Sequence, residues 1–309
     1  MIRSARTIVI PGGSGYLGRV LARHFVGAGD QVILLSRRPA ETKDGVTTLA
    51  WDAKTLGPWA TALEGADVVI NLAGRSVNCR YTARNKQLIY DSRLHSTKVL
   101  GDAIAAASNP PRVWINSSSA TIYRHAEDRA MDEHTGEIGT GFSVDVCQRW
   151  ERMFFESETP HTRKVALRTA MVFGGGKGGV MDAFDFIVRA GLGGTIGPGT
   201  QYMSWLHHED FAHIIEWIVA HDSIDGAVNA SSPNPVVNRA FMKAYRRAWG
   251  VPVGLPTFAW MLEIGAFVIR TESELLLKSR RVVPTRLLES GYEFRHPDWD
   301  GALRTLVAR

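Results

Sequence analysis

Glycines at a regular spacing follow the first apolar segment of the chain, and their position could hold a phosphate group. In "TIVIPGGSGYLG" (7–18), Gly12, Gly15 and Gly18 stand between a strand-like run and a helix-like run. Glycines in this place permit a tight turn and a close approach of the backbone to a pyrophosphate, whose charge the free amides of the helix start attract. The spacing therefore predicts dinucleotide binding, with a purely structural turn as the alternative.

The second strand-like segment ends in basic residues, and this indicates which dinucleotide would bind. In "LLSRRPA" (34–40), Ser36, Arg37 and Arg38 occupy the place where NAD-preferring sites usually carry Asp or Glu. An acid there would repel a 2′-phosphate, whereas arginine binds phosphate through forked, charge-assisted hydrogen bonds. The sequence predicts NADP(H) as the cofactor, and two solvated surface arginines are the alternative.

These segments belong to a longer alternation of strand-like and helix-like runs. Strands are expected at 7–12, 31–36, 46–51, 66–74, 112–119 and 164–173. Helices are expected after the glycine turn, at 82–107 and at 144–158. This order predicts the fold class α/β, with a Rossmann-type, doubly wound parallel sheet and helices on both of its faces.

The composition changes after the sixth expected strand. The glycine-rich segments 174–179 and 191–199 flank a helix-like stretch, and short helices fill the last third of the chain. We therefore expect an NADP-binding Rossmann domain at 1–173, to which a strand near 226–231 returns, and a smaller C-terminal substrate lobe with a helical segment at 174–309. Residues 174–179 are expected to cover the nicotinamide, with a phosphate cradle as the alternative.

Composition and charge exclude several classes of protein. The 309 residues are 45% hydrophobic and 22% charged, which is typical of a globular chain. The net charge is +5 and basic residues alternate with acidic ones, so no nucleic-acid-binding face is expected. The most apolar stretch, 257–269, contains Glu263 and is too short to span a membrane. Cys79 and Cys147 are far apart in the sequence, and the chain shows no leader-like start, so we expect a cytoplasmic protein without disulfides. Its expected partner is a small molecule, and its oligomeric state stays open.

Several longer motifs carry a resemblance to one known family. They are "GGSGYLG", "NLAG" (71–74), "DSRLHSTKVL" (91–100), "SSSATIY" (117–123), "RTAMVFG" (168–174), "GLGGTIGPGTQYMSWLHHED" (191–210) and "VPTRLLESGYEF" (283–294). From about residue 7 onward, the chain resembles the extended or atypical short-chain dehydrogenase/reductases, and more narrowly the NAD(P)-dependent "epimerase family" sometimes labelled SulA-like. The resemblance implies an NADP(H)-dependent oxidoreductase or nucleoside-sugar-epimerase-like protein that acts on an unidentified small molecule.

The resemblance also implies a set of cofactor contacts. The residues that match the family's pyrophosphate turn are Gly12, Ser14, Gly15, Tyr16, Leu17 and Gly18. The other matches are Ser36, Arg37 and Arg38 for the 2′-phosphate, Asp52 for adenine, Leu72, Ala73 and Gly74 for the ribose, Val172 for the nicotinamide, and Arg93 for a further contact. Core positions for Leu72 and Val172, and capping of a helix by Asp52, are the alternatives.

The usual proton-transfer pair of this superfamily is missing from the chain. Its members use a tyrosine whose pKa is lowered by a lysine four residues later, with a serine at the end of the fifth strand. Ser119 matches the serine, but Ser143 and Cys147 stand at the tyrosine and lysine positions. Tyr123 is the other catalytic candidate, with a structural role as its alternative. The chain is therefore expected to be either an enzyme with an unassigned proton donor or a non-catalytic NADP(H)-binding sensor or regulatory protein.

Two adjacent histidines raise the question of a metal site. His207 and His208 lie in "WLHHED" (205–210), where neighbouring side chains of an extended segment point to opposite sides and a third ligand at metal spacing is missing. We therefore expect no metal site here. The resemblance implies instead that His207 ties the two lobes together.

Overall fold

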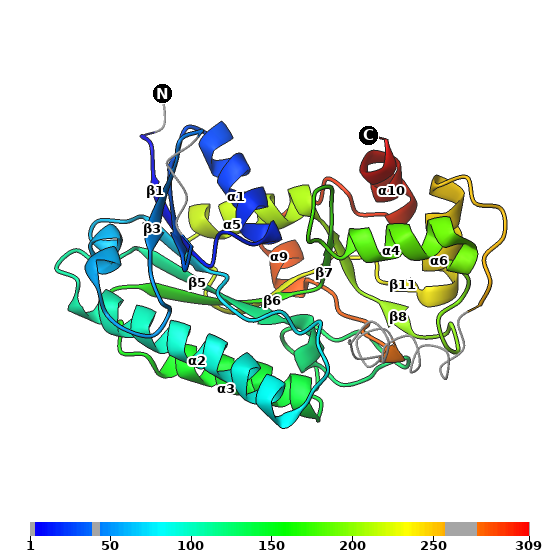
Figure 1. The fold of residues 1–309 in the computed structure, drawn as a ribbon, viewed down its shortest axis with the longest axis horizontal. Coiled ribbons are helices and arrows are strands. Elements are labelled where there is room, and N and C mark those ends of the chain that lie inside the picture. Colours follow the sequence, from blue (N-terminus) through cyan, green and yellow to red (C-terminus); the bar gives the residue numbers. More distant parts are fainter. Residues whose placement is uncertain (1–3, 39–43, 257–276, 309) are drawn as a thin grey trace.

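A parallel sheet of seven strands forms the centre of the computed structural model, which describes residues 4–38, 44–256 and 277–308. The strands are β1 (Thr7–Pro11), β2 (Gln31–Ser36), β3 (Val46–Ala50), β4 (Val68–Asn71), β5 (Val113–Ser119), β6 (Arg163–Thr169) and β10 (Gly226–Ala230). Their order in the sheet is β10-β6-β5-β4-β1-β2-β3 (Figure 1). The order reverses between β1 and β4, so the predicted Rossmann-type fold is confirmed and a crevice opens at the carboxyl ends of these two strands.

Helices cover both faces of this sheet. Helices α1 (Tyr16–Gly27) and α5 (His208–Ala220) lie on one face, and α2 (Ala83–Ala106) and α3 (Phe142–Glu156) lie on the other (Figure 1). Two short 3-10 helices are η1 (Pro58–Leu63) and η2 (Ala120–Ile122). The two faces explain the unbroken apolar strands: Ile8 and Ile10 pack with Leu21 of α1, whereas Val9 between them packs with Leu100 of α2.

A smaller lobe lies beside the carboxyl ends of the sheet (Figure 1). It holds β7 (Met171–Phe173), β8 (Tyr202–Met203), β9 (Trp205–His207), β11 (Val236–Val237), α4 (Met181–Ile187), the helical turn η3 (Val188–Leu192), α6 (Asn238–Ala248) and α10 (Trp299–Val307). Helix α9 (Thr285–Glu289) instead packs on β10 of the main sheet, where its Leu287 joins the core beneath α1 and α5. The core of the smaller lobe is aromatic: the ring of Trp299 stacks on Phe241 with centroids 4.1 Å apart and meets Phe173 at 4.9 Å.

One expected strand proves to be two. The run 164–173 was expected to be continuous, but β6 ends at Thr169 and β7 pairs separately with β9. The reason is tertiary: the amide of Ala170 binds the carbonyl of Ala230, and Met171 then turns to pair with Trp205. The strand expected near 226–231 is β10, which pairs with β6 in the main sheet, while the domain division at residue 173 stays a prediction.

The glycine turn brings three pieces of backbone into contact. Gly12 has a φ of +76°, and a Cβ there would lie 2.7 Å from the Cα of Ala73, just after β4. A Cβ on Gly18 would overlap the carbonyl oxygen of Gly13. Gly15 precedes α1 without a side-chain cap, and the first turn of α1 holds no acidic residue. Uncapped amides therefore face the crevice, where they can bind an anion.

The helices within residues 4–38, 44–256 and 277–308 do not have the length and apolar character that crossing a membrane requires. The apolar stretch 257–269 lies outside the described residues.

The contact between Gly18 and Gly13 makes a testable prediction about stability. Gly18→Ala should lower the free energy of unfolding by about 1–3 kcal/mol, because the new methyl group meets backbone that cannot move aside. Gly27→Ala in the same helix is the matched control, since nothing lies within 4 Å of its Cβ and alanine favours the helix. Urea unfolding followed by circular dichroism measures both, and equal stability of the two variants would contradict the packing described.

Candidate functional site

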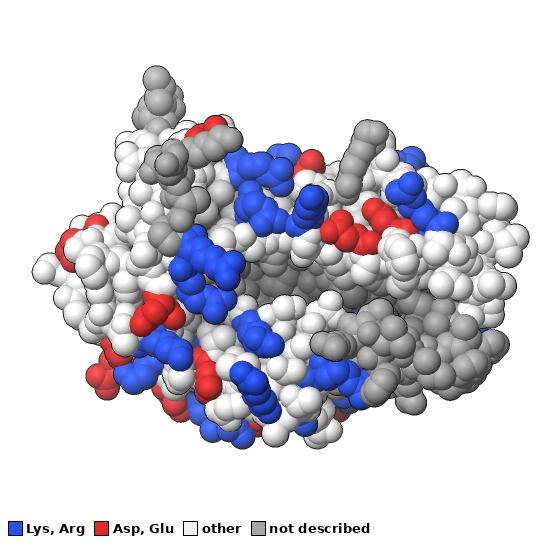
Figure 2. Space-filling view, viewed as in Figure 1, with Lys and Arg blue, Asp and Glu red and all other residues white. Residues whose placement is uncertain are grey.

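The carboxyl edge of the sheet opens into a hollow on the surface. Figure 2, drawn from the same side as Figure 1, shows this hollow over the region where β6 and β7 are labelled, with many lysine and arginine side chains on its rims. Acidic side chains gather at one end of the upper rim. A mainly basic rim favours negatively charged small molecules.

The glycine-rich segment 174–179 is tied to the start of α1. A Cβ on Gly174 would overlap the hydroxyl of Tyr16, so the segment packs directly on this ring. Arg19 donates hydrogen bonds to the carbonyl oxygens of Ser14 (2.8 Å) and Lys177 (2.6 Å). Segment 174–179 therefore lies beside the pyrophosphate turn. The role of Arg19 could not be predicted from the sequence, because Lys177 lies 158 residues away from it.

The residues matched to the adenine end lie after β2 and β3. Ser36 is buried, and its hydroxyl bonds the backbone of Arg38 at 3.1 and 3.2 Å, which closes the turn after β2. Arg37 and Arg38 are exposed. The carboxylate of Asp52 accepts hydrogen bonds from the backbone and hydroxyl of Thr55, which lower its pKa to about 2. The carboxylate of Asp52 thus closes a turn at 52–55 and does not cap a helix, because η1 begins at Pro58 after Gly57. Its contact with adenine stays a prediction.

Arg93 reaches from α2 to the loop after β4. Its guanidinium lies above the ring of Trp150 at 5.0 Å, and a Cβ on Gly74 would be 3.3 Å from its Cζ. It donates hydrogen bonds to the carbonyl oxygens of Arg75 and Ile89, and burial lowers its pKa. Among the described residues no carboxylate forms an ion pair with Arg93, and its contact with the cofactor stays a prediction.

A buried amide network ties the end of β4 to the middle of β5. Asn71 and Asn116 pair across the two strands, fully buried, with a hydrogen bond of 2.7 Å between their side chains. The side-chain oxygen of Asn71 accepts from the amide of Ala73, and Trp150 donates to Thr97, which in turn contacts Asn116. Sequence reasoning missed this network. The sequence signal for it is an asparagine after three apolar residues in each of two neighbouring strands, "VVIN" (68–71) and "VWIN" (113–116).

The serine at the end of β5 belongs to a small hydroxyl–thiol cluster. Ser119 accepts hydrogen bonds from the backbone and the hydroxyl of Thr121, and that hydroxyl lies 3.7 Å from the sulfur of Cys147. Burial raises the pKa of the Cys147 thiol, so the group at the usual lysine position is neutral. The hydroxyl of Ser143 is buried without a hydrogen-bond partner among the described residues. Neither residue replaces the phenol or the cation.

Tyr123 lies inside the protein. Its hydroxyl donates to Asn229 (3.0 Å) and accepts from Arg168 (2.9 Å), while Arg168 forms a buried ion pair with Glu151 (2.8 Å). Burial raises the pKa of Tyr123. Its ring is 1% exposed, so the geometry favours the structural alternative for this candidate. The burial of Val172, which pairs with Leu206, favours its core alternative as well.

His207 joins the start of α5 to α10. Its Nδ1 accepts from the amide of Glu209 (3.2 Å), and its Nε2 lies 3.3 Å from the hydroxyl of Thr305. The expectation that His207 and His208 point to opposite sides was wrong, because their ring centroids are only 4.5 Å apart. Helix α5 begins at His208, so the chain turns between the two side chains.

Comparison with known families defines the class of this protein. The "NAD dependent epimerase/dehydratase family" matches residues 8–231, and a "Domain of unknown function (DUF1731)" matches residues 257–306. The chain therefore belongs to the NAD dependent epimerase/dehydratase family, in agreement with its sheet order and glycine turn.

Within this class the chain is similar over nearly its whole length to proteins called epimerase family proteins. ML0860 of Mycobacterium leprae is 34% identical over 98% of this chain and 96% of its own, and YfhF of Bacillus subtilis is 30% identical over 97% and 98%. The human epimerase family protein SDR39U1, solved with NADPH, superposes with a TM-score of 0.87 at 27% identity and covers 98% of this chain and 99% of its own. The resemblance inferred from the motifs is confirmed.

The position of His207 predicts a pH dependence of stability. Burial, with His208 and His296 nearby, lowers its pKa to about 3. As the pH falls from about 6.5 to 3, His207 of the unfolded chain binds a proton whereas His207 of the folded protein stays neutral. The free energy of unfolding therefore decreases by up to about 1.4 kcal/mol for each unit by which the pH falls. Above that range both states are neutral and this contribution to the slope vanishes.

The measurement is urea unfolding of the wild type and His207→Gln at several pH values from 7 to 4. At pH 7 the wild type should have a larger free energy of unfolding than His207→Gln. The difference between the two should become smaller as the pH falls. His161→Gln changes an exposed histidine and should leave the slope unaltered. A constant difference between wild type and His207→Gln would contradict the buried, neutral state of this imidazole.

Proposed function

We propose that this chain binds NADP(H) at the carboxyl edge of the sheet and acts as an oxidoreductase or epimerase-like enzyme on a small molecule. The observation that carries the proposal is the glycine turn, where Gly12 packs on Ala73 and uncapped amides open α1. The residues present fit a pyrophosphate, because α1 begins without a side-chain cap and without an acidic residue in its first turn. The NADPH in the structure of the human relative supports the choice of cofactor.

The proposed contacts follow the matched residues. The pyrophosphate would lie against the turn formed by Gly12, Ser14, Gly15, Tyr16, Leu17 and Gly18. The 2′-phosphate would meet Arg37 and Arg38, which are exposed after β2 with Ser36 fixing their turn. Leu72, Ala73 and Gly74 offer backbone to the ribose, Asp52 and Val172 flank the two rings, and Arg93 adds a positive charge beside β4.

The proposed chemistry places Ser119 at the substrate. When bound, the nicotinamide supplies or accepts a hydride. Ser119 stands at the end of β5, and its hydroxyl, oriented by Thr121, would hydrogen-bond to the carbonyl or hydroxyl oxygen of the substrate. Tyr123 uses its hydroxyl within the protein, so the proton donor stays unassigned.

A non-catalytic sensor or regulatory protein is the second candidate. It is favoured by Cys147, a buried neutral thiol where the superfamily has a lysine, and by Ser143 where it has a tyrosine. Such a protein would keep the cofactor cradle and the smaller lobe but would not convert a substrate.

Cofactor choice gives a direct test of the binding site. NADPH should bind more tightly than NADH, as measured by titration of nicotinamide fluorescence. Arg37→Glu should weaken NADPH binding by on the order of 2–4 kcal/mol through lost pairing and added repulsion, and should leave NADH binding unchanged. Arg112→Glu alters an exposed arginine before β5 and serves as the charge-matched control. Equal weakening of both cofactors by Arg37→Glu would refute the 2′-phosphate contact.

Turnover separates the enzyme from the sensor. NADPH oxidation is followed with a library of small carbonyl compounds, and Ser119→Ala should reduce any rate by about 100-fold or more while NADPH binding is retained. Ser223→Ala changes an exposed serine away from β5 and controls for the substitution itself. Binding of NADPH without turnover across the library supports the sensor, and unchanged turnover in Ser119→Ala excludes this serine from the reaction.

A further inference from the structure

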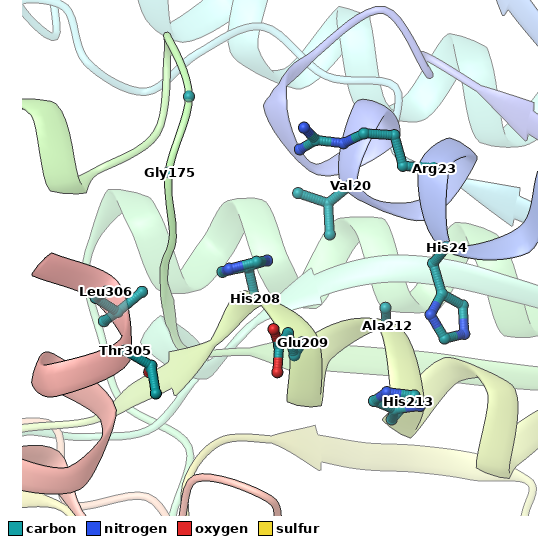
Figure 3. Close-up of a pocket in the computed structure, with 11 residues that line it drawn as sticks. Val20, Arg23, His24, Gly175, His208, Glu209, Ala212, His213, Thr305 and Leu306 are labelled. Carbon is teal, nitrogen blue, oxygen red and sulfur yellow. The ribbon is translucent and has the colours of Figure 1, made fainter. Parts of the chain in front are cut away.

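A pocket of about 590 Å³ lies outside the proposed cofactor site. It is lined by residues of α1, α5, α10 and segment 174–179, and it contains none of the residues matched to the cofactor. Figure 3 shows His24 on α1 and His213 on α5 side by side at one end of this pocket, with His208, Glu209 and Thr305 toward the other end. Two imidazoles from two helices thus meet at its edge.

A carboxylate completes this pair of histidines. Glu216 follows His213 by three residues on α5, so both side chains lie on one face of the helix. Its Oε2 is 3.0 Å from Nε2 of His24 and 3.5 Å from Nδ1 of His213, and all three atoms lie within 4.8 Å of one another. Atoms that bind one tetrahedral Zn²⁺ at 2.0–2.2 Å are separated by roughly 3.4 Å. The cluster therefore has the spacing of a metal site before any ion enters.

The surroundings hold this carboxylate in place. Arg6 approaches the other oxygen of Glu216 at 3.6 Å and is itself held by the buried Asp30 at 2.7 Å. Oε2 is thereby directed at the two imidazoles. Groups that surround a metal site commonly orient its carboxylate ligands in this way.

We propose that His24, His213 and Glu216 form a Zn²⁺ site that links α1 to α5, with a fourth position open to the pocket. Two histidines and one glutamate are a common donor set for zinc with an open position. On binding, Zn²⁺ takes the place of the hydrogen bond between Nε2 of His24 and Oε2 of Glu216. The site is independent of the cofactor cradle, because it lies on later turns of α1 than the glycine turn.

A second cluster is less suited to a metal. His207, His208 and Glu209 also bring their ligand atoms within 4.8 Å. However, both nitrogens of His207 are used in capping α5 and contacting Thr305, and Glu209 pairs with His296 at 2.9 Å. This cluster serves as the comparison in the experiment.

The test is a Zn²⁺ titration of the full-length protein after treatment with a chelator, in competition with a coloured zinc indicator. We expect one Zn²⁺ per chain, and about 100-fold or more weaker binding in His24→Gln and in His213→Gln. His208→Gln and His161→Gln should bind as the wild type does. Circular dichroism and NADPH binding show whether each variant is folded.

Two results would overturn the proposal. One is wild-type binding no tighter than about 1 mM. The other is affinity that is unchanged in His24→Gln and His213→Gln, or lost only in His208→Gln. Co²⁺ bound to the wild-type protein gives a readout that needs no variant: intense visible bands indicate four-coordinate geometry and support the site, whereas a pale six-coordinate spectrum contradicts it.

Discussion

The contact between Gly12 and the backbone of Ala73 is the constraint on which the site depends. It brings the end of β1 against the end of β4 at the point where the order of the strands reverses. Any side chain at Gly12 would push these two strand ends apart, and its φ of +76° also excludes most residues. The uncapped amides of α1 and the loop after β4 therefore face the same crevice. The hydrogen bond between Asn71 and Asn116 extends this fixed edge to β5, where Ser119 stands.

A second fixed region lies within the main sheet, near the ends of β6 and β10. Arg168 of β6 connects Glu151 of α3 with Tyr123, and Tyr123 connects to Asn229 of β10. The network is almost fully buried, so each polar group requires its partner. The hydroxyl of Tyr123 is therefore used to hold β10, the strand with which the chain returns to the main sheet. This explains how a tyrosine of the "SSSATIY" motif can be essential to the fold without facing a substrate.

Sequence reasoning succeeded where the determinant is local. The Rossmann-type sheet follows from apolar runs and a glycine turn, which are properties of short segments. It failed where distant segments decide: the break at Ala170 depends on Ala230 and Trp205, so 164–173 looked like one strand. The same holds for Arg19 with Lys177, and for His24 with Glu216, whose partners are separated by 158 and 192 residues. A single sequence carries no mark of such pairs.

The positive charge near Ser119 and Cys147 comes from a different helix than the superfamily pattern implies. A lysine at position 147 would place a cation on α3, next to the phenol whose pKa it lowers. Here the thiol of Cys147 is neutral, and the nearby cation is Arg93 on α2, resting on Trp150 one turn after that thiol. The guanidinium of Arg93 lies against Gly74 after β4, and its charge also acts on the Cys147 thiol. One arginine on α2 therefore lies between the loop after β4 and the hydroxyl–thiol cluster of Ser119, Thr121 and Cys147, whereas the superfamily pattern has a lysine on α3 for the second of these regions.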